Sequence, residues 1–184
     1  VRQLLGFARR EPGTPEPTYL RTAISEVNRL MRAAIPPTIR IEGVRDCTPV
    51  TVLADPTHLH QILMNLTANA AEAIGDAKGQ IQISARALDD IPEGLSARAE
   101  GWVELVVEDD GPGMSEDTAA RIFDAFYTTK PLGKGTGLGL SVVQGLVQDM
   151  GGRISVETAP GRGTLFRLLL PGAAVGTARE TGAP

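Results

Sequence analysis

The stretch ADPTHLHQILMNLTANAAEAIGD, residues 54–76, carries the start signal of a long helix and two asparagines near its centre. Asp55 suits an N-cap and Pro56 suits a first helical position. An apolar stripe at helical spacing predicts that one face of this helix packs on a core. The stripe consists of Leu59, Ile62, Leu63, Leu66, Ala70, Ala73 and Ile74. The pattern therefore predicts an amphipathic helix over residues 56–76.

Three polar side chains, Asn65, Asn69 and Glu72, share one face of this helix because they follow one another at intervals of four and three residues. Asparagine is a poor residue in the middle of a helix, since its side chain competes for backbone hydrogen bonds. One interpretation is a polar helix edge that faces solvent. The other is a pair of amide oxygens aimed at a cation or a polar ligand, of the kind that Mg²⁺ accepts beside water and phosphate oxygens.

Helices and pairs of strands alternate on both sides of this segment. Upstream, an amphipathic helix is predicted over 18–35, with its buried face formed by Leu20, Ile24, Val27, Leu30 and Met31. Alternating or β-branched residues then predict a hairpin from segments 38–44 and 49–55. Downstream, we expect strands at 80–88 and 101–111, a short helix at 115–123 capped by Ser115, a non-periodic segment at 125–138, a helix at 139–150, and strands at 153–158 and 164–170.

This order of elements favours an α+β fold of two layers over a doubly wound α/β fold, because strands occur in pairs between the helices. The expected architecture is a two-layer sandwich in which a mixed, mostly antiparallel sheet carries about three main helices on one face. A chain of 184 residues with 42% hydrophobic and 22% charged residues can form such a core.

Composition also restricts the possible partners and compartment. The net charge of −4 argues against non-specific nucleic-acid binding, which needs a basic surface. A single cysteine, Cys47, excludes an internal disulfide framework and indicates a reducing, cytoplasmic location. No apolar run is long enough to span a bilayer, so we expect no direct membrane contact by this chain. The chain begins with Val1, and we expect it to be a fragment whose parent protein can be membrane-anchored.

A second motif, VVEDDGPGM at 106–114, places Asp109 at the end of a strand and follows it with Gly111, Pro112 and Gly113. Asp-Gly and Pro-Gly dipeptides form turns, so the segment can be an ordinary turn after a strand. Alternatively, it fixes a carboxylate that accepts a hydrogen bond, while Gly113 lets a flat ligand lie against the backbone. A purine with an exocyclic amine suits such an acceptor.

A third motif, GKGTGLG at 133–139, precedes the helix predicted at 139–150. Glycines before a helix let several N–H groups converge on an anion, which the helix dipole also attracts. It is not a Walker A loop, because Gly135 rather than serine or threonine follows Lys134, and Leu140 breaks the pattern G-x-G-x-x-G. The alternative is a flexible surface loop.

The combination and order of these motifs, completed by GRGTLF at 161–166, resemble the ATP-binding catalytic domain of bacterial sensor histidine kinases. This branch belongs to a superfamily shared with DNA gyrase, the MutL mismatch-repair proteins and the large heat-shock chaperone. The resemblance covers about residues 38–171, and the form of RIFDAFYTTK (121–130) is similar to that of nitrogen-sensor and hybrid-type kinases. It implies a Bergerat-type ATP-binding fold with ATP and Mg²⁺ as ligands.

The resemblance also implies roles for single residues. Asp109 accepts a hydrogen bond from the adenine amino group, Thr164 supports it through water, and Asn69 holds Mg²⁺. Asn65 and Lys130 take the catalytic positions, and Asn65 stands where gyrase-like relatives keep a glutamate that activates water. The remaining residues implied to contact the nucleotide are Glu72, Gly111, Gly113, Met114, Phe126, Gly135, Thr136, Gly137, Leu138, Gly139 and Leu140.

Some positions depart from the family pattern. Ala73 stands where many relatives carry an aromatic ring near the adenine, and Ala125 stands where proline is usual. The two histidines, His58 and His60, lie at the start of the asparagine-bearing helix, and His60 is followed by Gln61 rather than by an acidic residue. We interpret both as structural, so the phospho-acceptor histidine is expected to be missing from this chain.

The domain organisation implied by the resemblance has four parts: the end of a dimerisation helix at 1–10, a hinge linker at 11–17, the ATP-binding domain at 18–171 and a disordered tail at 172–184. The implied partners are the protein's own dimerisation domain and a response regulator or fused receiver domain, in a homodimeric parent and a monomeric fragment. Two other functions stay open: a nucleotide-sensing module without transfer, and a gyrase-like or MutL-like ATPase, which Asn65 disfavours.

Overall fold

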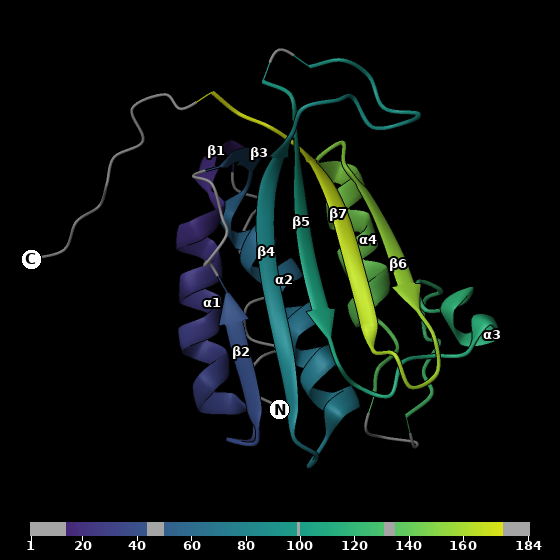
Figure 1. Ribbon diagram of the computed structural model, residues 1–184. Coiled ribbons are helices and arrows are strands. Elements are labelled where there is room, and N and C mark those ends of the chain that lie inside the picture. Colours follow the sequence, from purple (N-terminus) through teal and green to yellow (C-terminus); the bar gives the residue numbers. More distant parts are fainter. Residues whose placement is uncertain (1–13, 44–49, 99, 131–134, 175–184) are drawn as a thin grey trace, which may run out of the picture.

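A five-stranded sheet and three helices packed on one of its faces form the body of the molecule (Figure 1). The computed structural model describes residues 14–43, 50–98, 100–130 and 135–174. The sheet has the order β2 (Ile39–Gly43), β4 (Gly79–Leu88), β5 (Trp102–Asp109), β7 (Thr164–Pro171) and β6 (Arg153–Thr158). The covering helices are α1 (Leu20–Ala34), α2 (Pro56–Ile74) and α4 (Gly139–Asp149). The predicted two-layer α+β sandwich is confirmed.

The sheet is mostly antiparallel, as expected, but the predicted hairpin between 38–44 and 49–55 is wrong. β2 pairs in parallel with β4, whereas β3 (Thr51–Ala54) pairs with β1 (Glu16–Tyr19) in a separate two-stranded sheet. Both segments are strands because their residues alternate or are β-branched. The hairpin is wrong because adjacency in the sequence does not determine which strands pair.

The helix α2 begins as its sequence predicts. The Asp55 side chain caps it by accepting a hydrogen bond from the Thr57 N–H at 2.8 Å, and Pro56 occupies its first turn. Of the predicted stripe, Leu59, Ile62, Leu63 and Leu66 are completely buried, but Ala73 is exposed at the helix margin. Each fully buried leucine or isoleucine side chain contributes roughly 1.5–3 kcal/mol relative to an exposed one.

Other boundaries differ from the expected ones. On α1, Leu30 is 50% exposed rather than part of the buried face, while Leu20, Ile24, Val27 and Met31 are buried. The helix α3 covers only Glu116–Ala119, although Ser115 caps it as predicted by accepting from the Thr118 N–H at 3.3 Å. No helix among the described ranges has both the length and the apolar character that crossing a bilayer requires.

The two ends of the predicted domain also lie differently. β1 begins at Glu16, inside the segment expected to be a linker, and Gly172 and Ala173 of the expected tail donate backbone hydrogen bonds to Gly101 and Thr51. The expected dimerisation-helix end at 1–10 and the tail beyond residue 174 lie outside the described residues. The domain limits proposed from the resemblance therefore stay predictions.

The turn between β6 and β7 brings two backbones into unusually close contact. Gly161 and Gly163 both have positive φ, at 76° and 72°. A Cβ atom on Gly163 would lie only 1.9 Å from the Asp109 carbonyl oxygen, whereas one on Gly161 would meet nothing within 4 Å. Gly163 therefore permits the end of β5 to approach this turn.

Replacing Gly163 with alanine is expected to destabilise the chain much more than replacing Gly161. Gly161→Ala should cost about 1–2 kcal/mol, because both positions require a left-handed backbone. Gly163→Ala should cost at least about 2 kcal/mol more, because the added methyl group overlaps the Asp109 carbonyl. Thermal and urea unfolding of the two variants measure this difference, and equal losses of stability would contradict the steric explanation.

Candidate functional site

The start of α4 lies over the asparagine-bearing face of α2. A Cβ atom on Gly139, the first residue of α4, would lie 3.8 Å from Asn65 Oδ1 and 3.9 Å from Asn69 Nδ2. The absence of a side chain at Gly139 therefore leaves the backbone of this helix start next to the two amides. The predicted anion-binding segment and the predicted cation ligands are neighbours in the fold.

Asn65 and Asn69 are half-buried, and neither amide has a hydrogen-bond partner among the residues that the structure describes. Unsatisfied amide oxygens beside a helix N-terminus suit a ligand that carries both a cation and phosphate oxygens. The described residues contain no cluster of three or more histidine, cysteine, aspartate or glutamate side chains that could hold a metal ion by themselves. The donor set thus fits Mg²⁺ held jointly with phosphate oxygens, rather than an all-protein metal site.

Asp109 ends β5 on the face of the sheet that the helices cover. It is only 5% exposed, and its Oδ1 accepts a hydrogen bond from the Gly111 N–H at 2.9 Å. Burial raises the pKa of this carboxyl above its ordinary value, against the opposing effect of the Gly111 N–H. A buried carboxyl acceptor at a strand end is suited to a ligand's amino group.

Thr164 lies directly opposite Asp109 in the β5–β7 register and is also buried. It is joined by a residue that the sequence reasoning missed: Thr158, the last residue of β6, lies opposite Thr164. The two Oγ1 atoms are 3.3 Å apart. The paired positions at the ends of three adjacent strands therefore form a polar row of Asp109, Thr164 and Thr158 on one face of the sheet.

The segment that follows β5 is held by close backbone contacts. Gly113 has a φ of 66°, and a Cβ there would lie 2.0 Å from the Ala159 carbonyl oxygen. A Cβ on Gly111 would lie 2.7 Å from Asp109 Oδ1. Met114 is partly buried against the core. Gly113 is thus required by the fold itself, whereas a side chain at Gly111 would displace the carboxylate of Asp109.

Lys130 forms an ion pair with Glu72 of α2, and both side chains are partly exposed. The pair joins Lys130, a predicted catalytic residue, to the helix face that carries Asn65 and Asn69. A Cβ on Gly135 would lie 3.1 Å from Lys130 Cδ, so the lysine also lies against the glycine segment. Residues 131–134, including the Gly133 and Lys134 of the predicted loop, lie outside the described residues.

The described part of the glycine segment, residues 135–139, contacts the backbone of Phe126 just before α4. The Phe126 N–H donates to the Gly137 carbonyl at 2.9 Å, and both residues have positive φ. The Phe126 side chain is 75% exposed. Thr136 Oγ1 accepts from the Leu138 N–H at 3.4 Å, Leu138 is exposed, and Leu140 is partly buried against the core. Phe126, Thr136 and Leu138 therefore remain accessible, whereas Leu140 packs inward.

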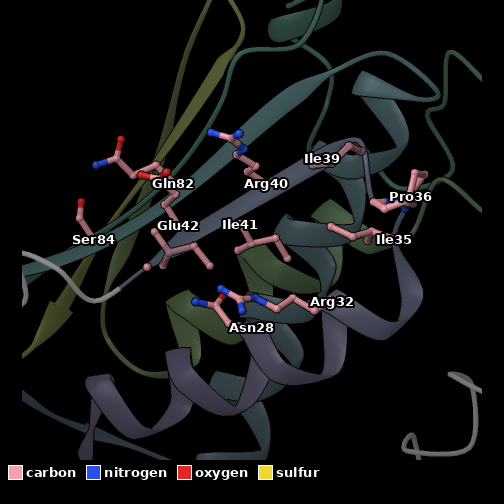
Figure 2. A pocket seen from close by; sticks show the side chains of 13 residues that line it. Asn28, Arg32, Ile35, Pro36, Ile39, Arg40, Ile41, Glu42, Gln82 and Ser84 are labelled. Carbon is pink, nitrogen blue, oxygen red and sulfur yellow. The ribbon is translucent and has the colours of Figure 1, made fainter.

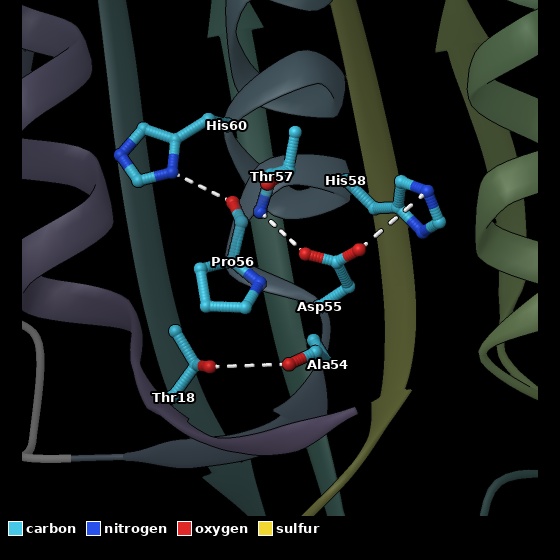
Figure 3. Close-up of polar contacts among 7 residues, drawn as sticks. All are labelled: Thr18, Ala54, Asp55, Pro56, Thr57, His58 and His60. Atoms are coloured by element: carbon cyan, nitrogen blue, oxygen red, sulfur yellow. Dashed lines mark hydrogen bonds and ion pairs between the residues drawn. The ribbon is translucent and has the colours of Figure 1, made fainter. Parts of the chain in front are cut away.

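Both histidines have structural contacts at the start of α2 (Figure 3). His60 contacts the Pro56 carbonyl through Nδ1 at 2.7 Å and the Glu26 carboxylate of α1 through Nε2 at 2.6 Å. His58 Nε2 lies 3.7 Å from Asp55 Oδ2, beside the helix cap. These contacts support the interpretation that both histidines stabilise the helices instead of accepting a phosphoryl group.

A groove of about 660 Å³ lies elsewhere, between α1 and the edge strand β2 (Figure 2). Figure 2 shows Asn28 and Arg32 on the helix side, and Arg40, Glu42 and Gln82 on the strand side. None of the residues predicted to bind a ligand lines it. Two local arrangements identify the candidate site better than groove size does: Asn65 and Asn69 beside the start of α4, and Asp109 opposite Thr164.

Residues 54–174 match the family of histidine kinase-, DNA gyrase B-, and HSP90-like ATPases. Among curated relatives, the chain is 37% identical over 180 residues to the sensor kinase CckA of Brucella abortus, covering 93% of this chain and 18% of that protein. It is 33% identical to the sensory histidine kinase/phosphatase NtrB of Rhizobium leguminosarum, covering 90% of this chain and 43% of the relative. The chain thus spans less than half the length of either relative.

Solved structures show the same fold. The full-length protein ShkA in complex with AMPPNP superposes with a TM-score of 0.72 at 32% identity, covering 97% of this chain and 36% of that one. The catalytic domain of the histidine kinase ThkA gives a TM-score of 0.67 at 32% identity, covering 85% of this chain and 95% of that one. The architecture derived above is therefore that of a catalytic domain of this type.

Replacing Asp109 with asparagine is expected to lower nucleotide affinity without lowering the stability of the fold. Burial raises the folded-state pKa of Asp109, so its ionised form is disfavoured by folding, and its contribution to stability is lost as pH rises through that pKa. The nucleotide-free Asp109→Asn chain should therefore melt at or above the wild-type temperature at pH 7, with the difference shrinking as the pH falls. Its affinity for ADP should fall by about tenfold or more.

Calorimetric titration with ADP and thermal unfolding at several pH values measure the two effects. Glu108→Gln is the matched control, because Glu108 is the exposed neighbour on the opposite face of β5. Unchanged ADP affinity in Asp109→Asn would remove Asp109 from the binding site.

Proposed function

Because the chain belongs to the family of histidine kinase-, DNA gyrase B-, and HSP90-like ATPases, we propose that it binds Mg²⁺-ATP and donates the γ-phosphoryl group to a histidine on a dimerisation domain. The sensor histidine kinases among its relatives make it an ATP-binding catalytic domain of that type. One observation carries the proposal further. The amides of Asn65 and Asn69 lie beside the first residue of α4, and Asp109 supplies a buried carboxyl group at the end of β5.

In the proposed complex, Asp109 accepts a hydrogen bond from the adenine amino group, and Thr164 supports it from the paired position on β7. The start of α4 attracts the phosphates, because its backbone N–H groups lack intrahelical partners. Mg²⁺ neutralises phosphate charge when it is bound, and the Asn69 amide oxygen is its protein ligand in this proposal. Asn65 lies beside it and completes the polar face of α2.

Transfer breaks the bond between the γ-phosphorus and the bridging oxygen of ATP and forms a bond from phosphorus to an imidazole nitrogen. A neutral imidazole attacks with its own lone pair and needs no general base. The domain therefore has to position the γ-phosphate and neutralise its charge. An amide at Asn65 cannot take a proton from water. This chemistry favours transfer to a protein acceptor over the hydrolysis of a gyrase-like or MutL-like ATPase.

Lys130 supplies a mobile positive charge in this proposal. Its ammonium group is paired with the carboxylate of Glu72, at the border of the polar face of α2. A phosphate oxygen competes with the Glu72 carboxylate for the same ammonium group, which binds phosphate as a point charge. We therefore assign Lys130 to the γ-phosphate end of the site and Glu72 to its counter-charge.

The parent protein's partners follow from the same proposal. The acceptor histidine belongs to a dimerisation domain of the parent homodimer, and a response regulator or receiver domain takes the phosphoryl group from that histidine. The relatives are named as sensor kinases and are longer than this chain. ATP as a ligand and a sequence with a single cysteine both suit a cytoplasmic location for the domain.

Replacing Asn69 with alanine tests the assignment of Mg²⁺. In the wild-type chain, we expect Mg²⁺ to raise the affinity for ATP, and in Asn69→Ala this gain should fall by at least about tenfold, because an oxygen ligand is lost. Titration calorimetry with and without EDTA measures the gain. Gln61→Ala is the matched control, since Gln61 is an exposed amide on the same helix. An intact Mg²⁺ effect in Asn69→Ala would contradict the assignment.

Phosphotransfer in trans tests the reaction itself. The chain should label a supplied dimerisation domain with γ-phosphate from ATP, and it should not label itself, because His58 and His60 are engaged at the start of α2. Gel autoradiography with and without the supplied domain measures both. ATP binding without transfer would favour a nucleotide-sensing module, and steady hydrolysis by the chain alone would favour a gyrase-like ATPase.

A further inference from the structure

Thr158 occupies the centre of a small hydrogen-bond network at the end of the sheet. Its Oγ1 donates to the Gly163 carbonyl at 2.8 Å and accepts from the Met114 N–H at 3.0 Å. Thr164 Oγ1 lies 3.3 Å from the same atom. One hydroxyl therefore joins three parts of the structure: the end of β6, the β6–β7 turn with the start of β7, and the segment that follows β5.

The number of protons in this network fixes the direction of its hydrogen bonds. A threonine hydroxyl has one proton and two lone pairs. The proton of Thr158 is directed at the Gly163 carbonyl, which can only accept. One lone pair of Thr158 receives the Met114 N–H, so the contact with Thr164 can form only if Thr164 is the donor.

This direction determines what Thr164 offers to a ligand. With its proton turned toward Thr158, the Thr164 hydroxyl presents only lone pairs on its other side. Asp109 lies directly opposite on β5, and a carboxylate, once ionised, is also only an acceptor. The carboxylate of Asp109 and the hydroxyl of Thr164 thus form two neighbouring acceptors. A purine base whose amino group can donate to them is favoured over one that presents a carbonyl oxygen.

We infer that Thr158 is a positioning residue for base selection, which holds the Thr164 hydroxyl as an acceptor and so makes the site prefer 6-amino over 6-oxo purine nucleotides. The inference rests on the proposed nucleotide-binding function. Thr158 acts through Thr164 and through the Met114 backbone, and it needs no contact with the base itself.

A purely structural role for Thr158 is the competing explanation, and it predicts a different result. In that case, loss of the hydroxyl lowers stability because the Met114 N–H and the Gly163 carbonyl lose a partner. The affinities for two purine nucleotides would then fall together. A change in the ratio of these affinities is the observation that a structural role does not produce.

The test compares ADP with inosine diphosphate, which differs in carrying an oxygen and a ring N–H in place of the amino group and ring nitrogen. Titration calorimetry on the 184-residue chain measures both affinities for the wild type, Thr158→Val and Thr158→Ser. In Thr158→Val, the Thr164 hydroxyl is released and can donate to the inosine oxygen. The preference for ADP should fall by about five- to tenfold, corresponding to one hydrogen bond, while Thr158→Ser should keep it.

Thr164→Val provides a second test that leaves the Thr158 contacts to Met114 and Gly163 in place. It should reduce the ADP preference, and adding Thr158→Val to it should reduce the preference no further, because Thr158 acts through Thr164. A wild-type ratio in either Thr158→Val or Thr164→Val would overturn the inference. Failure of the wild-type chain to bind any purine nucleotide would instead overturn the proposed function on which it rests.

Discussion

The close approach of the backbones of Asp109 and Gly163 is the constraint on which the candidate site depends. A side chain at Gly163 would overlap the Asp109 carbonyl, so β5 and the β6–β7 turn reach this distance only because the position is glycine. The contact lies where β5 ends, and it places Asp109 opposite Thr164. A buried carboxylate is costly, and it is retained here with the Gly111 N–H as its partner. The position of the buried polar pair Asp109 and Thr164 therefore depends on this backbone contact.

The second half of the site is built by helix packing. α2 presents buried leucines and isoleucines to the sheet and leaves its asparagines at the margin, while α4 packs beside it with a glycine as its first residue. A larger first residue would place its side chain beside the amides of Asn65 and Asn69. The same packing that buries the apolar face thus holds helix N–H groups and amide oxygens at a spacing that suits phosphate and a cation.

Much of this arrangement could be predicted from the sequence, because local patterns specify elements and motif order specifies the family. The cap of α2, the shared face of Asn65 and Asn69, and the strand that ends in Asp109 all follow from the sequence pattern.

The predicted hairpin between 38–44 and 49–55 was wrong, since strand propensity carries no information about which strand is the partner. Thr158 was missed for a related reason: only the β6–β7 register brings it to Thr164. The strand β1 was missed because its Pro17 belongs to the proline-rich segment 11–17, which has the sequence pattern of a break, although proline is tolerated on a short edge strand.

The ion pair between Lys130 and Glu72 shows why a charged contact in the site need not resist ligand binding. Both side chains are partly exposed, and exposed ion pairs contribute only about 0–1 kcal/mol, because water and salt screen them. A lysine paired with a phosphate gains a charge-assisted hydrogen bond from an acceptor with more negative charge than one carboxylate. If Lys130 binds a phosphate oxygen as proposed, breaking its ion pair with Glu72 costs little, and the more negative phosphate is the stronger partner. The exposed ion pair with Glu72 therefore restrains Lys130 only weakly. The part-buried hydrogen bonds of Thr158 differ, because their loss would leave the Met114 N–H and the Gly163 carbonyl without this partner.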